Sequence, residues 1–399
     1  MNILLLRHYN PYTESGASAN RFRGLVEGLC REGHSVTIGI VGGELHKGEA
    51  ASFKHDVEGL RVEYLSHSNH YHPLCGRLNT YFFDDLIHLP AASRDVRKLL
   101  KEQRFDIVWL TNQASVLGSF RKVQKQIKGR TFIELNEFND IYKEEKEGNF
   151  LQRRKGARDN RMFLDTIGKI DLFAVMTKTL TEHYRQMAKP EAKFMLLPMT
   201  VDMTRFMNVK DTVMYNKPYI AFTGTMSNQK DGVDVLIKAF IKNAVKYPDL
   251  HLYLAGFWHY DVPAQDKLIE ESGVSNRIHR LGVLEREQIP PFVCNARVLA
   301  LSRPNSHQAQ GGFPTKLGEY LATGNPVCVT KVGEIPDYLE DNVSAFMAEP
   351  GSVESFADAL DRAMGEKAEM VGTAGREVAE ESFDVAKQAR RLSEFLKSK

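Results

Sequence analysis

The stretch 310–327 holds residue types that could bind an anionic ligand. Gly311 and Gly312 carry no side chains, so their backbone could approach a ligand closely. Thr315 and Lys316 follow at the start of a helical pattern, where they would join the free N–H groups of the first turn around an anion. The pattern therefore predicts an anion site, although an ordinary capped helix has the same features.

A carboxylate stands close to this predicted anion site. Pro314 suits the first turn of the helix, and Gly324 would end it before a strand begins at Pro326. Glu319 would lie one turn into this helix, where its carboxylate could accept hydrogen bonds from the two hydroxyls of a ribose. Together these residues predict a site for a nucleotide.

The surrounding sequence predicts the elements that would position such a site. Short apolar runs alternate with helical patterns, which is typical of a parallel sheet covered by helices. The runs that we predict to be strands are 3–6, 36–41, 106–110, 171–176, 219–223, 250–255, 297–301 and 326–329. The predicted helices include 22–29, 233–244, 285–294, 315–323, 352–364 and 383–397.

The alternation is interrupted once, at residues 198–218, where prolines bracket a stretch without periodicity. We interpret this stretch as the link between two doubly wound α/β domains, residues 1–200 and 201–382, followed by a final helical segment, 383–399. Ligands of doubly wound sheets bind beyond the carboxyl ends of the strands. A cleft between the two domains is therefore the expected site.

Composition excludes several classes of protein. The 399 residues are 42% hydrophobic and 26% charged, which is ordinary for a globular protein with two domains. No run of about 18 uncharged apolar residues is present, so we expect no membrane-spanning helix. The four cysteines are scattered and form no CxxC pair, which favours free thiols and a cytoplasmic protein.

Charge is distributed unevenly along the chain. Residues 1–200 hold 30 Lys and Arg against 24 Asp and Glu, whereas residues 201–399 hold 23 against 27. Basic residues of the first half gather at 94–104, 121–130 and 153–161. They are either solvated helix faces or a surface that attracts an anionic membrane or acceptor. No recognisable module interleaves them with stacking aromatic residues, so we do not expect a nucleic-acid partner.

Several stretches, in the right order, resemble the motifs of glycosyltransferase family 4, whose members are retaining enzymes of the GT-B fold. The resemblance covers nearly the whole chain and is strongest over 219–340. The stretches are a glycine loop with the strand after its helix (14–36), a linker (198–206), a phosphate loop (222–234), a turn beside the nucleobase (280–283) and the signature segment (310–327).

The resemblance implies two facing Rossmann-like domains and a nucleotide diphosphate sugar as donor. Lys230 would neutralise the donor diphosphate, and Glu319 would hold the ribose. The implied donor-binding residues are Gly16, Gly224, Lys230, Gly282, Arg303, Gly311, Gly312, Phe313, Thr315, Lys316 and Glu319. It also implies that the segment 383–399 packs back on the first domain.

This sequence departs from the family pattern at three places. Gly311 stands where the family has the first glutamate of its Glu-seven-residues-Glu motif, so that contact to the donor sugar is missing or supplied elsewhere. Thr225 stands where an arginine often precedes the phosphate lysine, and Arg303 or Lys316 could supply that charge.

The third departure follows the strand corresponding to Thr131–Leu135. Many members carry a histidine there, whereas this chain has Asn136 and Glu137, which could take over its catalytic work. We therefore treat Asn136 and Glu137, with Lys230 and Glu319, as catalytic candidates.

Metal chemistry has little support in the sequence. No Asp-x-Asp motif stands beside a predicted strand end, so we expect protein groups, without a metal or other cofactor, to neutralise the diphosphate. His67, His70 and His72 could bind a metal, but no Cys or carboxylate shares their spacing.

The sequence thus predicts a retaining glycosyltransferase. The resemblance implies an acceptor that is a carbohydrate or a lipid-linked oligosaccharide in cell-surface polysaccharide synthesis, reached in the cytoplasm or at the inner membrane face. A GT-B sugar-nucleotide epimerase and a non-catalytic scaffold that binds sugar nucleotides remain as alternatives.

Overall fold

The computed structural model describes residues 1–13, 16–42, 52–65, 89–138, 150–207, 209 and 215–398. Contacts within the chain divide it into two compact units. Unit 1 comprises Met1–Leu197 with Gln388–Lys399, and unit 2 comprises Pro198–Lys387. The described part of the stretch 198–218 therefore belongs to unit 2.

Unit 1 is built on an eight-stranded sheet with the order β3-β4-β2-β1-β5-β6-β7-β8. Every neighbouring pair is parallel except β3 and β4. β5 and β7 are buried along their whole length, as expected for parallel strands covered on both faces. The strands are β1 (Asn2–Arg7), β2 (Ser35–Ile40), β3 (Ser52–Lys54), β4 (Leu60–Tyr64), β5 (Ile107–Leu110), β6 (Arg130–Leu135), β7 (Leu172–Val175) and β8 (Lys193–Leu196).

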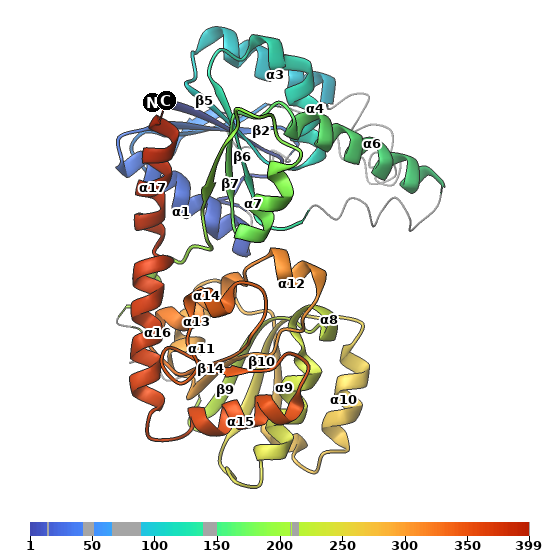
Figure 1. Ribbon diagram of the computed structural model, residues 1–399, viewed down its shortest axis with the longest axis vertical. Coiled ribbons are helices and arrows are strands. Elements are labelled where there is room, and N and C mark those ends of the chain that lie inside the picture. Colours follow the sequence, from blue (N-terminus) through green and yellow to red (C-terminus); the bar gives the residue numbers. More distant parts are fainter. Residues whose placement is uncertain are drawn as a thin grey trace. The chain divides into compact units, whose positions relative to one another are not determined.

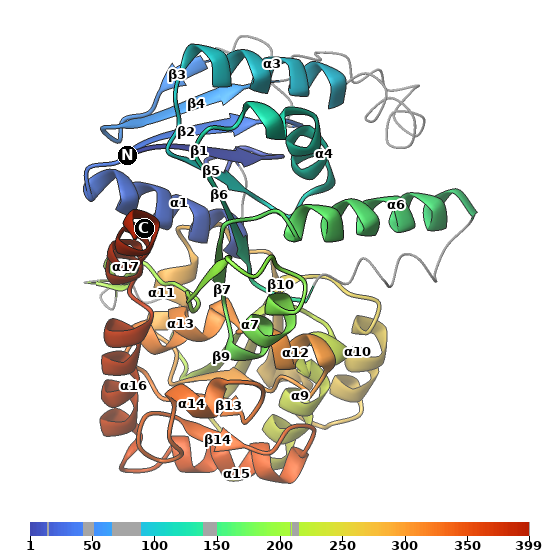
Figure 2. The same cartoon turned by 45° about the horizontal axis from the view of Figure 1, so that its top comes forward.

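Helices cover both faces of this sheet. Figure 2 shows the strands of unit 1 between α3 and α4 on one side and α1 on the other. α1 buries Phe22, Leu25, Val26 and Leu29, the residues from which the helix was predicted. The helices are α1 (Ala17–Arg31), α3 (Leu89–Glu102), α4 (Ala114–Val123), the 3-10 turn η2 (Gln124–Gln126), α6 (Phe150–Ile167) and α7 (Lys178–Arg185).

The last helix, α17 (Val385–Lys397), belongs to unit 1 from Gln388 onward. The apolar stripe of this part, Ala389, Leu392 and Leu396, is fully buried. Between these residues, Ser393 Oγ lies 2.7 Å from His34 Nε2. The guanidinium of Arg130 donates to the carbonyl oxygens of Leu396 and Ser398. These bonds satisfy carbonyls that the end of a helix leaves without partners.

Unit 2 has a six-stranded, fully parallel sheet with the order β11-β10-β9-β12-β13-β14. Its strands are β9 (Tyr219–Thr225), β10 (His251–Phe257), β11 (Ile278–Gly282), β12 (Val298–Leu301), β13 (Val327–Thr330) and β14 (Phe346–Ala348). α9 and α15 pack side by side in front of this sheet in Figure 1, and α13 packs on α16.

The remaining helical elements connect these strands or follow them. They are η3 (Met203–Phe206), α8 (Asn228–Asp231), α9 (Val233–Asn243), α10 (Val262–Glu270), η4 (Ser275–Arg277), α11 (Ile289–Cys294), α12 (His307–Gly311), α13 (Thr315–Ala322), α14 (Ile335–Tyr338), α15 (Val353–Ala363) and α16 (Ala368–Ser382). No described helix is long and apolar enough to span a bilayer.

Two predicted helix starts were wrong. The helix predicted to begin at residue 285 begins only at Ile289. Pro290 and Pro291 lack N–H groups, so they fit the first turn of a helix but not its interior. Pro314 lies one position before its helix, as the N-cap with φ −71° and ψ 113°, and not in the first turn.

Candidate functional site

The carboxyl end of β9 leads into residues that are suited to bind an anionic ligand. β9 runs through Gly224 to Thr225, and the short helix α8 that follows carries Lys230. Gly224 has φ 151°, and a Cβ built on it would lie 2.1 Å from Nζ of Lys316. The lysine ammonium therefore occupies the space that any side chain at position 224 would need.

Lys316 and Asp231 form a largely buried ion pair. The Lys316 Nζ and Asp231 Oδ1 atoms are 2.9 Å apart, and the two side chains are 17% and 5% exposed. The ammonium also lies 4.8 Å from the centre of the Phe222 ring. The other carboxylate oxygen, Asp231 Oδ2, is buried without a hydrogen-bond partner among the described residues.

Two more cations act on Lys316. Burial lowers the pKa of the Lys316 ammonium; Asp231 opposes this shift, and the positive charges of Lys230 and Arg303 add to it. Arg303 is buried just beyond the end of β12, whereas Lys230 is exposed. Three cations thus act on one another at the edge where doubly wound sheets bind ligands, and Asp231 pairs with one of them, Lys316. This arrangement suits a multiply charged anion.

Helix α13 brings Lys316 and Glu319 to this edge. Its Tyr320 hydroxyl accepts a hydrogen bond from the backbone N–H of Thr223, at 2.7 Å, which fastens the helix to β9. Thr315 is the half-buried first residue of the helix. The predicted anion site at the start of α13 therefore lies on the same side of the sheet as the cations.

Gly311, Gly312 and Phe313 precede α13 and are themselves uncharged. Gly311 ends α12 and is buried, and Gly312 is extended, with φ −105° and ψ 155°. The Phe313 ring packs against Tyr338 and Phe383, each with ring centres 5.4 Å away, and the residue is 5% exposed. Its side chain is thus part of the core of unit 2, which leaves only its backbone for a ligand.

Glu319 is held by an arginine that the sequence analysis did not single out. Its Oε1 atom accepts a hydrogen bond from Nη1 of Arg205 at 2.9 Å. Burial raises the pKa of the Glu319 carboxyl, while Arg205, Arg286 and Lys316 oppose the shift. Arg205 lies in the linker motif 198–206, which lacks the periodicity that reveals helices and strands.

The ends of β10 and β11 complete this edge of unit 2. A Cβ on Gly256 of β10 would lie 1.8 Å from the carbonyl oxygen of Gly224, so the two strand ends approach this closely only because residue 256 is a glycine. Gly282 ends β11 with φ 70° in open space. Phe257 and Trp258, beside Gly256, are 57% and 69% exposed.

The predicted residues of unit 1 lie at the carboxyl side of its own sheet. Gly16 is the N-cap of α1, with φ 108°, and a Cβ built on it would meet no described atom within 4 Å. Asn136 follows β6, and its Oδ1 is buried without a partner among the described residues. The side chain of Glu137 is exposed, and its carbonyl oxygen accepts from the Tyr184 hydroxyl at 2.9 Å.

A buried ion pair accompanies these residues in unit 1. Glu134, in β6, accepts from the guanidinium of Arg21, and both side chains are at most 2% exposed. The same guanidinium donates to the carbonyl oxygen of Leu197 at 3.0 Å. Removing one partner from a pair this deeply buried would leave an uncompensated charge.

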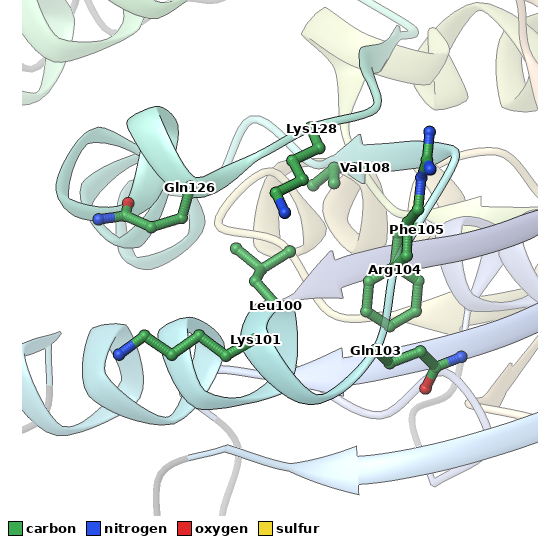
Figure 3. Close-up of a pocket in the computed structure, with 8 residues that line it drawn as sticks. All are labelled: Leu100, Lys101, Gln103, Arg104, Phe105, Val108, Gln126 and Lys128. Carbon is green, nitrogen blue, oxygen red and sulfur yellow. The ribbon is translucent and has the colours of Figure 1, made fainter.

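Unit 1 also has a small pocket at the opposite, amino edge of its sheet. Its volume is about 130 Å³. Figure 3 shows the Lys128 side chain reaching toward Leu100 beside Val108, while Lys101 and Arg104 extend away from the pocket. The lining residues are Leu100, Lys101, Gln103, Arg104, Phe105, Val108, Gln126 and Lys128.

The sequence offers three histidines as candidate metal ligands. His67, His70 and His72 lie outside the described residues. Within the described part of the chain, no three His, Cys, Asp or Glu side chains come together as a metal site would require.

Comparisons with known proteins agree with the resemblance seen in the sequence. Residues 217–366 match the family model described as "Glycosyl transferases group 1". The amylovoran biosynthesis glycosyltransferase AmsK of Erwinia amylovora is 26% identical over 216 residues, which are 53% of this chain and 52% of AmsK. The chain therefore spans about half the length of this relative.

Solved structures match over nearly the whole chain. A sucrose-phosphate synthase from Thermosynechococcus elongatus has a TM-score of 0.74 at 14% identity, with 98% of this chain and 97% of that chain covered. The Anabaena protein Alr3699/HepE in complex with UDP has a TM-score of 0.69 at 15% identity, with 99% of each chain covered. The expected fold class, GT-B with two parallel-sheet α/β domains, is confirmed.

Proposed function

We propose that this chain, whose residues 217–366 match the group 1 glycosyltransferase model, is a glycosyltransferase that transfers a sugar with retention from a nucleotide diphosphate sugar to a carbohydrate or lipid-linked acceptor. One observation carries the proposal: the Lys316 ammonium lies beside Gly224 at the carboxyl end of β9, where the positive charges of Lys230 and Arg303 act on it. A diphosphate is the anion that this arrangement suits. The UDP complex of HepE, a protein of the same fold, adds support.

The cations would act on the leaving group. Transfer breaks the bond from the anomeric carbon to the phosphate oxygen and forms a bond from that carbon to an acceptor hydroxyl, whose proton leaves with the departing diphosphate. Negative charge grows on the diphosphate as the bond breaks, and preorganised cations stabilise that charge. Lys230 is the exposed cation that can reach the ligand, and the half-buried Lys316 is held by Asp231.

Lys316 is the better substitute for the arginine that Thr225 replaces. Its ammonium lies in the space beside Gly224, immediately before Thr225. Arg303, just beyond the end of β12, is more deeply buried, and its positive charge acts on Lys316. We therefore assign the missing charge to Lys316 and keep Asn136 and Glu137 of unit 1 as the catalytic candidates nearest the acceptor.

The proposal includes diphosphate neutralisation by protein groups without a metal. The three cations supply the positive charge for which other phosphoryl sites use a divalent ion. Activity should therefore persist in excess chelator. Activity that disappears in chelator and returns with magnesium or manganese would contradict this part of the proposal.

We also propose that unit 1 meets the acceptor at an anionic membrane surface. The basic clusters lie on or just after α3 and α4 and on α6, and α4 packs on both α3 and α6 (Figure 1). Three of these cations, Lys101, Arg104 and Lys128, line the pocket between α3 and the start of β6. The relative AmsK, named for amylovoran biosynthesis, supports a role in surface polysaccharide assembly.

Turnover tests the function directly. We expect a sugar nucleotide from a panel of UDP-, GDP-, ADP- and dTDP-sugars to release its nucleoside diphosphate faster when a lipid-linked glycan acceptor is present. An epimerase would convert the donor without acceptor, and a scaffold would bind it without turnover. Either of these results would replace the transferase assignment.

A further inference from the structure

We propose that Arg205 is the positioning residue of the donor site: it orients the Glu319 carboxylate, and it ties this glutamate to the loop that follows β11. The inference rests on the proposed function, because it assigns Glu319 to the ribose of a bound nucleotide. Arg205 belongs to η3, a few residues after the chain enters unit 2 at Pro198.

The contact between the two residues leaves half of the carboxylate available. Arg205 Nη1 donates to Glu319 Oε1 at 2.9 Å, and the side chains are 13% and 24% exposed. No described residue donates to the other oxygen, Glu319 Oε2. Because a carboxylate has lone pairs on both oxygens, Oε2 can accept from ribose hydroxyls while Oε1 stays with the arginine.

Arg205 comes from a well-anchored segment. Its neighbours Met203 and Phe206 are buried, and Asp202 caps the turn by accepting from the N–H of Thr204 at 3.1 Å. The guanidinium lies over the Phe206 ring, 5.5 Å from its centre. Because both its backbone and its guanidinium are held in this way, the Arg205 side chain can fix the orientation of Glu319.

The same guanidinium reaches a second part of the site. Arg205 Nη2 donates to the carbonyl oxygen of Arg286 at 3.2 Å. Arg286 lies in the loop that begins after Gly282, the turn that the family resemblance places beside the nucleobase. The forked guanidinium of Arg205 thus links Glu319, which we expect to bind the ribose, to the loop that we expect beside the base. A lysine, with a single ammonium group, cannot reproduce this geometry.

The electrostatic role follows from burial. The charged groups that act on Glu319 are Arg205 from η3, Arg286 from the loop after β11 and Lys316 from its own helix. Burial favours the protonated acid, and these cations favour the carboxylate. Since a protonated carboxyl loses acceptor capacity toward ribose hydroxyls, removing Arg205 should make nucleotide binding fail as the pH falls.

Calorimetry with nucleotides tests the proposal. The probe is whichever of UDP, GDP and ADP the wild-type protein binds most tightly, together with its 2′,3′-dideoxy form. Arg205→Ala should weaken binding of the ribonucleotide at least tenfold at pH 7.5, and more at pH 6. Binding of the dideoxy form should change far less, because it lacks the hydroxyls that Glu319 would accept.

Two further variants separate positioning from folding. Arg205→Lys keeps the positive charge but not the fork, so we expect a near-wild-type pH profile with intermediate affinity. Arg376→Ala removes an arginine that pairs only with Glu380, four residues along α16, among the described residues, and should leave both nucleotides unaffected.

The outcomes are distinguishable. Equal loss for the ribonucleotide and the dideoxy form, or an unchanged affinity and pH profile in Arg205→Ala, would overturn the role of Arg205 while the proposed function stood. If the wild-type protein binds none of the three nucleoside diphosphates, the proposed function fails, and this assignment fails with it.

Discussion

Unit 1 and unit 2 share a doubly wound architecture but differ in how they carry positive charge. Unit 1, counted with its C-terminal residues, holds 34 Lys and Arg against 25 Asp and Glu, a net charge of +9. Unit 2 holds 19 against 26, a net charge of −7. The cations proposed to hold the diphosphate nevertheless belong to unit 2.

The difference lies in burial. Arg94 and Lys98 of unit 1 are 77% and 74% exposed, and their partners are neighbours on the same helix. Exposed pairs of this kind contribute little to stability, but their charges remain available at long range. Lys316 of unit 2 is 17% exposed and fixed against Asp231. Net charge therefore describes the surface of each unit, whereas the proposed site is recognised by a largely buried cation that an ion pair holds in place.

The largest expected effect is on the stability of unit 1, whose core includes the last helix of the chain. Leu392→Ala removes a fully buried side chain of α17 from unit 1 and should cost about 2–5 kcal/mol of stability. Glu394→Ala, an exposed change on the same helix, should cost less than about 0.5 kcal/mol. Denaturant unfolding of the two variants measures the contrast.

If the two variants unfold alike, α17 does not contribute to the core of unit 1. Nucleotide binding offers a second readout, because the proposed donor residues that carry charge all lie in unit 2. Folded Leu392→Ala should therefore retain wild-type affinity for the nucleotide.

The next prediction tests whether the Lys316 ammonium must occupy the space beside Gly224. Gly224→Ala would bring a Cβ within 2.1 Å of the lysine ammonium and should reduce nucleotide affinity at least tenfold. Gly273→Ala is the matched control, because Gly273 has φ 73° but a Cβ added there would meet no described atom within 4 Å. Both changes strain a backbone with positive φ, by roughly 1 kcal/mol.

Calorimetry and thermal unfolding of both variants separate strain from displacement of the ammonium. Equal affinity in the two variants would show that Lys316 does not need the space at position 224 for its proposed role.

A smaller effect is expected on the pH dependence of the stability of unit 1. Burial, followed by the N-terminal ammonium and Lys397, lowers the pKa of His34 to about 4. A histidine that is neutral when folded contributes stability above its unfolded pKa, and this contribution is lost as the pH falls from about 6.5 toward 4. We expect a loss on the order of 1–3 kcal/mol over this window.

His34→Gln removes the titration and should flatten that part of the stability curve. Urea unfolding at pH 7, 5.5 and 4.5 compares the two proteins. Parallel curves would mean that His34 does not control the acid sensitivity of unit 1.

The smallest effect per residue concerns the exposed charge of unit 1. Each basic residue near an anionic bilayer contributes on the order of 1 kcal/mol, and salt screens it. The protein should co-sediment with anionic but not neutral vesicles at low salt, and Lys101→Glu with Lys128→Glu should reduce the bound fraction. Equal recovery with both vesicle types would favour a soluble acceptor.

Local patterns predicted much of this structure. Val233, Leu236, Ile237, Phe240 and Ala244 recur at helical spacing in the sequence, and all are buried, the first four in α9 and the last at its C-cap. The predicted strands 3–6, 219–223 and 326–329 each overlap an observed strand. Such patterns work because burial imposes a period on the residues of one element.

Such local patterns could not predict contacts between residues that lie far apart in the sequence. Asp231 lies in α8 and Lys316 in α13, which the fold brings together, and Arg205 meets Glu319 through a linker without periodicity. Short strands such as β14, with three residues, are too brief to show a period. The sequence could therefore indicate Lys316 and Glu319 as candidate site residues, but not the partners that hold them.

The most direct test of the central claim is titration of wild-type protein and Lys316→Ala with UDP, GDP and ADP, and with the nucleosides that lack the diphosphate. The account predicts that at least one nucleoside diphosphate binds the wild-type protein, that Lys316→Ala binds it at least tenfold more weakly, and that the weak binding of the nucleoside is unchanged. Removing a charge-assisted contact costs roughly 1.5–3 kcal/mol, which agrees with that factor. Equal binding of the diphosphate to both proteins, or no binding to the wild type, would contradict the assignment of the donor site to unit 2.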